Sequence, residues 1–131
     1  TVRPVITQGP YGYTQGVNVA AQRADSASLL NLITRFAHLR KQCPEIGWSH
    51  WKLLDTGSEA VVAIQYDWQD RSVLVVYNFS PDPQPCQLTT SLRPNSRLTD
   101  LLNHTENRPT TDGRFTVQLP GYGYKWYRLK K

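Results

Sequence analysis

The most hydrophobic stretch of the chain covers residues 72–80 and reads Ser-Val-Leu-Val-Val-Tyr-Asn-Phe-Ser. Its apolar residues follow one another without polar alternation, and β-branched residues dominate its first half. At this length, such a run is typical of a strand covered on both faces rather than of a helix. We therefore predict a buried strand here, with the other elements arranged around it.

Several shorter segments also carry strand patterns, and turn-forming residues separate them. Short turns at 56–58 and 67–70 join the first three as an antiparallel meander, and polar alternation at 115–119 indicates one face in water. Three prolines then interrupt the chain, and we expect them to lead it to a second sheet because proline cannot donate to a strand ladder. The predicted strands cover 48–54, 60–66, 72–79, 87–88, 97–100, 115–119 and 124–129, with the prolines at Pro81, Pro83 and Pro85. The predicted fold is mainly β, an antiparallel sandwich or barrel.

One amphipathic helix precedes the strands. Asp25 or Ser26 can cap its first turn, and Pro44 ends it near Gln42. Its apolar stripe is wide and comprises Leu29, Leu30, Ile33, Phe36 and Ala37, broadened by Leu32 and Leu39. A stripe of this width predicts a substantial partner, which for this chain would be the sandwich or a second copy.

Residues 1–17 are rich in Gly, Pro and Tyr and are predicted to form a loop. Tyr11 and Tyr13 could stack on a sugar ring, but we expect them rather to pack the loop onto the body of the protein. The same two interpretations apply to the tryptophans of the chain. Trp48, Trp51, Trp68 and Trp126 are either sugar-stacking platforms or, as we expect for most of them, core residues.

Composition and charge exclude several classes of function. The chain has 131 residues, 39% of them hydrophobic and 19% charged, and it contains no apolar run long enough to cross a membrane. Its net charge of +5 is scattered rather than clustered, so no nucleic-acid partner is expected. Cys43 and Cys86 lie in unlike settings and are expected to be free thiols. The chain lacks Met and signal-peptide features, from which we expect a piece of a longer, cytoplasmic protein.

The sequence gives no support for catalysis within these residues. His38, His50 and His104 lie in no catalytic motif, and no spacing of His, Cys or acidic residues suits a metal. The glycines near the end of the chain are followed by aromatics rather than by a helix that could bind phosphate. We therefore predict no catalytic residue, no metal site and no cofactor.

A set of short motifs resembles the carboxyl-terminal part of α-amylase-family enzymes, and within that family the trehalose synthases. The elements Leu-Arg-Lys and Val-Tyr-Asn-Phe-Ser are shared widely, whereas Asn-Val-Ala-Ala-Gln and Pro-Glu-Ile-Gly-Trp indicate the narrower group. The motifs lie at 17–22, 28–31, 39–41, 43–48, 54–57, 75–80 and 121–127. The span from 81 to 112 matches least.

The resemblance implies a specific anatomy. Residues 1–45 would be the last loop and final helix of a (β/α)₈ catalytic barrel, and residues 46–131 the C-terminal β-sandwich that stabilises it. The parent enzyme would convert maltose to trehalose by retaining glucosyl transfer, and its catalytic acids would lie upstream of this chain. The partner would then be the missing barrel, with self-association through the helix as a further possibility. A sugar-binding sandwich, or the same domain of another α-amylase-family hydrolase, is the alternative.

Overall fold

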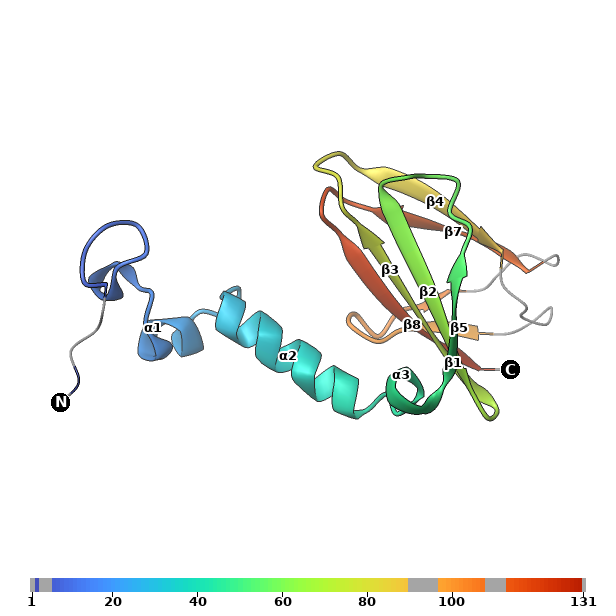
Figure 1. Cartoon of the computed structure of the whole chain (residues 1–131), viewed down its shortest axis with the longest axis horizontal. Helices are drawn as coiled ribbons and strands as arrows, with labels where there is room; N and C mark the ends of the chain where they lie inside the picture. The colour runs from blue at the N-terminus through green and yellow to red at the C-terminus, as the bar shows by residue number, and fades with distance from the viewer. Residues whose placement is uncertain (1, 3–5, 90–96, 108–112, 131) are drawn as a thin grey trace. The chain divides into compact units, whose positions relative to one another are not determined.

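The structure is a computed structural model that describes residues 2, 6–89, 97–107 and 113–130. The chain divides into two compact units, Thr1–Gln42 and Cys43–Lys131. The first is helical and the second is mainly β (Figure 1). No helix in the described ranges is long and apolar enough to cross a membrane.

The first unit contains a 3-10 turn and two helices, namely η1 (Tyr13–Gln15), α1 (Val19–Ala24) and α2 (Leu29–Lys41). The predicted long helix is therefore α2, but the predicted cap was wrong. Ser28 caps α2 by accepting a hydrogen bond from the Asn31 amide, whereas Asp25 ends α1. A short turn of helix, α1, thus occupies the segment just before the expected start of α2.

The second unit begins with a short helix and continues with strands. Their bounds are α3 (Glu45–Trp48), β1 (His50–Leu54), β2 (Val61–Trp68), β3 (Arg71–Asn78), β4 (Gln84–Thr89), β5 (Arg97–Asp100), β6 (Glu106–Asn107), β7 (Arg114–Leu119) and β8 (Tyr124–Lys130). The strand predicted at 72–79 is confirmed as the central strand β3, in which five consecutive residues from Ser72 to Val76 are buried. Phe79 was wrongly included, because it lies just beyond β3 and is exposed. Trp48, predicted to begin the first strand, instead lies in α3.

The strands form two antiparallel sheets. A six-stranded sheet has the order β1-β2-β3-β8-β5-β6, and a two-stranded sheet pairs β4 with β7. The prolines do lead the chain to the second sheet, as predicted, but Pro85 lies inside β4, opposite Gln118. β4 tolerates this proline because it pairs only with β7. Its other edge has no partner strand, so a residue without a backbone N–H can be accommodated there.

The main core comes from inward-facing residues of both sheets. Side chains alternate along each strand, and the inward set packs as one cluster. That cluster comprises Val61, Ala63, Leu74, Val76, Cys86, Leu88, Leu98, Phe115, Val117, Leu119, Tyr127 and Leu129. The opposite, outer face of the six-stranded sheet is also apolar. Cys43 and Cys86 are both buried, and they form no disulfide with each other.

Candidate functional site

The first unit carries an open apolar groove of about 510 Å³. Its lining comes from the loop, α1 and the start of α2, and consists of Tyr11, Val17, Asn18, Val19, Gln22, Leu29, Leu30 and Ile33. Of the two tyrosines considered as candidates for sugar stacking, Tyr11 lines the groove and Tyr13 does not. Tyr13 instead lies in η1, where its carbonyl accepts a hydrogen bond from Asn18.

A network of side-chain to backbone hydrogen bonds holds the walls of this groove together. The Asn31 amide group donates to three carbonyls at the end of α1, at 3.0 Å to Gln22, 3.3 Å to Arg23 and 2.7 Å to Asp25. The Ser28 hydroxyl also donates to the Gln22 carbonyl, at 2.5 Å. The short α1 therefore owes its shape to residues that lie in and just before the next helix.

The apolar stripe of α2 is covered unevenly. Leu29 and Ile33, near its start, are 64% and 57% exposed. Phe36 is half-buried and Leu39 is buried. Burying a large apolar side chain contributes roughly 1.5–3 kcal/mol, so the first half of the stripe leaves much of its stabilising surface unused.

The tryptophans of the second unit lie outside the core between the two sheets, so the expectation that most are core residues was wrong. By strand alternation Trp51, Trp68 and Trp126 belong to the outer face of the six-stranded sheet. Trp126 is 7% exposed and donates from Nε1 to the Tyr77 hydroxyl at 3.0 Å. Trp48 is 79% exposed and Trp51 is also exposed.

An ion pair between a buried carboxylate and a partly exposed arginine joins α3 to the six-stranded sheet. Glu45 is fully buried in the first turn of α3, and its Oε1 lies 3.6 Å from Nε of Arg128 on β8. The same guanidinium donates to the Cys43 sulfur at 3.4 Å. An unpaired buried carboxylate would be costly, so this contact fixes how the chain enters the sandwich.

Two further carboxylates are held in structural networks of the second unit. Burial by itself raises the pKa of Asp67, but hydrogen bonds from Ser72 and Gln65 and the charge of Lys52 outweigh it, and the net shift is downward. Asp100 is fully buried, and the Lys125 ammonium lies 2.9 Å from its Oδ2. A carboxylate held ionised in this way suits structure better than proton donation.

The remaining candidate groups do not assemble into a reactive site. Burial raises the pKa of the Cys86 thiol, with Asp55 adding to the effect, so this cysteine is a weak nucleophile. The three histidines lie on separate elements: His38 on α2, His50 on β1, and His104 in the connection after β5. Among the described residues, no group of three His, Cys, Asp or Glu side chains could hold a metal ion.

The clearest candidate for a functional feature is therefore the apolar groove of the first unit. The residues that shape this groove were already part of the sequence motifs. Asn18, Gln22, Ser28 and Asn31, which shape the groove, all lie in the motifs at 17–22 and 28–31. The sequence identified these residues as members of a family motif, but it did not predict the hydrogen bonds that join them. Their hydrogen bonds cross from one helix to the next and follow no periodicity.

A model of the maltogenic amylase C-terminal domain matches residues 51–126. A trehalose synthase/amylase of Mycobacterium tuberculosis is 33% identical over 123 residues, which cover 91% of this chain and 20% of that protein. Trehalose synthases of Pimelobacter and Thermus thermophilus are 30% and 32% identical, over 96% and 97% of this chain and 22% and 13% of theirs. The chain thus spans about a fifth or less of these relatives.

Parts of several solved structures have the same fold as this chain. A trehalose-6-phosphate hydrolase of Bacillus licheniformis superposes with a TM-score of 0.69 at 21% identity, over 89% of this chain and 21% of that protein. An α-amylase of Anoxybacillus gives 0.68 at 20% identity, over 78% and 22%.

Proposed function

Because this chain belongs to the family of maltogenic amylase C-terminal domains, we propose that it is the non-catalytic end of a longer enzyme of the trehalose synthase kind. Residues 1–45 are then the last loop and final helix of a (β/α)₈ catalytic barrel, and residues 46–131 are the β-sandwich that stabilises it. The parent enzyme converts maltose to trehalose by retaining transfer of a glucosyl group, in a site closed to water.

One observation carries this proposal, namely the uncovered apolar groove of the first unit. The groove is well built, since Asn31 and Ser28 fix its walls by hydrogen bonds, yet its floor exposes Leu29 and Ile33. A surface that is both ordered and apolar is typical of an interface with another body. In the parent enzyme that body is the rest of the barrel.

The test uses the parent enzyme. Full-length enzyme, and a version ending just before Thr1, are assayed for trehalose formation from maltose and for thermal unfolding. We expect the shortened enzyme to lose activity and most of its folded yield, and a separately made 131-residue chain to restore part of both. A shortened enzyme with full activity and unchanged unfolding contradicts the proposal, as does a gene that encodes no barrel. Glucose as the only product assigns the parent to the hydrolases instead.

A second candidate function is sugar binding by the sandwich itself. The exposure of Trp48 and Trp51 favours it, since exposed aromatic rings stack on sugar rings. Titration of the chain with maltose or trehalose, followed by tryptophan fluorescence, tests it. A saturable change that disappears in Trp51→Leu supports sugar binding, and an unchanged spectrum at millimolar sugar excludes it.

A further inference from the structure

One corner of the outer face of the six-stranded sheet carries aromatic side chains next to cations. The corner lies at the hairpin between β2 and β3, where Trp68 pairs directly with Arg71. Further along β2, Tyr66 pairs with Trp51 of the edge strand β1. Residues that pair across antiparallel strands share a face, and their Cβ atoms lie about 4.5–5.5 Å apart. The three aromatic residues are therefore neighbours, with Arg71 at one end of the group.

The aromatic rings of this corner remain accessible to solvent. Trp51 is 64% exposed, and Tyr66 and Trp68 are half-buried. The short helix α3 packs against β2 and β3 and ends at Trp48, which is 79% exposed and is separated from β1 by Ser49 alone. Large aromatic side chains that are grouped and exposed in this way are typical of a binding surface.

A row of cations continues from Arg71 across the sheet. In the strand register Arg71 lies opposite Lys130 on β8, and Lys130 lies opposite Arg97 on β5. Like charges in directly opposite positions destabilise a sheet, whereas an anion bound between them would be attracted by both. Arg71 is exposed and makes no ion pair with any residue that the structure describes.

The carboxylates near this row leave it positively charged. Glu106 lies 3.8 Å from Arg97, but both side chains are 56% exposed, so their attraction is weak. Asp67 belongs to the inner face by strand alternation, and there it accepts a hydrogen bond from Ser72. Asp70 is exposed in the turn between β2 and β3, and its charge opposes the binding of an anion beside it.

A sugar phosphate combines the two chemical groups that suit this corner. The C–H surface of a pyranose ring stacks on an indole ring, and a guanidinium binds phosphate through paired, charge-assisted hydrogen bonds. We propose that Trp68 and Arg71, with Trp51 beside them, form a surface site for a phosphorylated glucose. The inference rests on the proposed function, which supplies the sugar, and it deepens the second candidate function by adding the phosphate.

Calorimetric titrations of the 131-residue chain with glucose 1-phosphate, glucose and inorganic phosphate test this site. We expect glucose 1-phosphate to bind with a Kd at least about fivefold lower than that of glucose or of phosphate. Arg71→Gln should weaken the binding of glucose 1-phosphate about tenfold and leave that of glucose unchanged. Asp70→Asn should strengthen it about twofold, because a like charge is removed.

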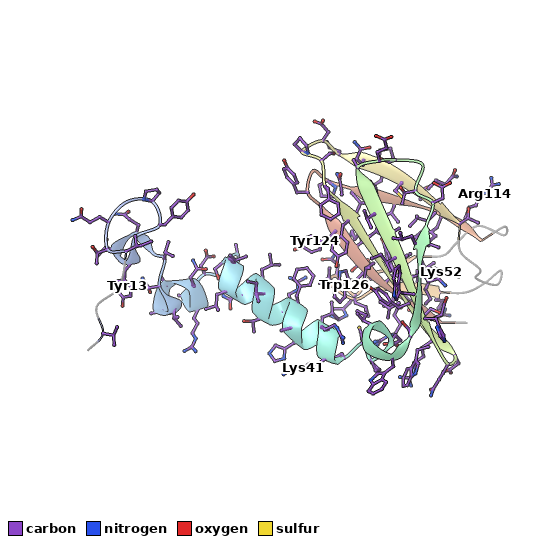
Figure 2. All side chains as sticks on the ribbon, in the orientation of Figure 1. Tyr13, Lys41, Lys52, Arg114, Tyr124 and Trp126 are labelled. Atoms are coloured by element: carbon purple, nitrogen blue, oxygen red, sulfur yellow. The ribbon has the colours of Figure 1, made fainter. Side chains whose placement is uncertain are left out.

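The matched control for the loss of one positive charge is Lys41→Gln. Lys41 is exposed in the last turn of α2, in the first unit, and is labelled in Figure 2. This variant should bind glucose 1-phosphate as the unsubstituted chain does. Equal losses in Lys41→Gln and Arg71→Gln overturn the proposal, because they assign the binding to the net charge of the chain.

Three further outcomes contradict the site. Equal affinities for glucose 1-phosphate and inorganic phosphate mean that the rings contribute nothing and that phosphate is an adventitious ion only. Equal affinities for glucose 1-phosphate and glucose overturn the phosphate contact but leave the second candidate function standing. Tighter binding of AMP than of glucose 1-phosphate assigns the corner to nucleotides instead.

Hydroxyl-radical footprinting of the unsubstituted chain gives an independent measurement if a variant does not fold. Glucose 1-phosphate should protect Trp51 and Trp68 from oxidation, and the absence of protection at both overturns the site. The calorimetric titration is repeated on the full-length enzyme with and without Arg71→Gln, and an unchanged affinity there overturns the site in the enzyme. The origin of the chain in a longer enzyme is decided separately by the test of the shortened parent.

Discussion

Asp100 holds three segments of the sandwich through one buried carboxylate. Its Oδ1 accepts from the amides of Leu102 and Asn103 at 2.9 and 3.2 Å, and its Oδ2 accepts from the Asn103 side chain and from Lys125, both at 2.9 Å. Burial by itself would raise the pKa of this group, but these hydrogen bonds outweigh it. The pKa of Asp100 therefore lies below its ordinary value of 3.8.

Replacing Asp100→Asn removes the charge and places an amide against four donors. We expect a loss of about 2–3 kcal/mol in the free energy of unfolding at neutral pH, because hydrogen bonds to charged groups contribute about 1.5–3 kcal/mol. A group with a depressed pKa stabilises the fold above its unfolded pKa and loses that effect as pH falls through its folded pKa. The difference between wild type and variant should thus shrink below about pH 3.8. Urea unfolding across pH measures it.

The exposed acid Asp70, in the turn between β2 and β3, provides the control for that experiment. Asp70→Asn should change the free energy of unfolding by less than about 0.5 kcal/mol at any pH, as expected for a surface substitution. An Asp100→Asn protein as stable as the wild type at neutral pH would show that the network contributes nothing.

Gly121 allows a second test at a single residue. Gly121→Ala places a methyl group against the Pro81 carbonyl, so the turn before β8 must move, and we expect a loss near the upper end of the range of about 1–3 kcal/mol for overpacking. Gly57→Ala is the matched control, since its Cβ would meet open space and only its φ of 66° opposes the change. Thermal unfolding of both variants should show the larger loss at Gly121. Equal losses would mean that the close approach is easily relieved.

At the scale of elements, α3 depends on the ion pair between Glu45 and Arg128. Arg128→Leu leaves a buried carboxylate without its cation and should cost about 3–5 kcal/mol, whereas Glu45→Leu with Arg128→Leu should recover most of that loss. A double-mutant cycle by urea unfolding measures the coupling. A double variant no better than Arg128→Leu alone would show that packing, rather than charge, holds α3.

Elements with a long hydrophobic pattern were predictable, and elements fixed by distant hydrogen bonds were not. The strand at β3 and the helix at α2 follow from continuous or periodic apolar residues. The short α1 does not, because Asn31 and Ser28 stabilise its end from outside. The helix cap was misplaced for the same reason: several residues before α2 can cap, and only tertiary contacts select Ser28.

The sequence predicted that apolar surface would be present, but it did not predict which residues would be exposed. The width of the α2 stripe predicted a partner, either the sandwich or a second copy, but Leu29 and Ile33 are exposed in the single chain. Most of the tryptophans were expected in the core, because periodicity cannot distinguish the two covered faces of a strand such as β3. Phe79 was predicted as the last residue of a strand but lies beyond β3 and is exposed, because the end of a strand depends on the turn that follows it.

At the scale of the whole molecule, the exposed apolar surface governs how the isolated chain behaves. We expect the 131-residue chain to self-associate through the groove of its first unit, since burying Leu29 and Ile33 removes apolar surface from water. Leu29→Glu with Ile33→Glu should shift it toward monomer, as measured by light scattering over a concentration series. Thr34→Glu, on an exposed position of α2, is the control. A wild-type chain that stays monomeric at all concentrations contradicts this expectation.

β1 is an edge strand of the six-stranded sheet, and an uncovered edge strand can cause aggregation. β1 pairs with β2 along one side, and its residues Trp51 and Leu53 are exposed. Such an edge is a template for fibril growth, whereas a proline within an edge strand, as in β4, interrupts it. A chain in which this edge of β1 is uncovered is therefore expected to add strands from other copies of itself.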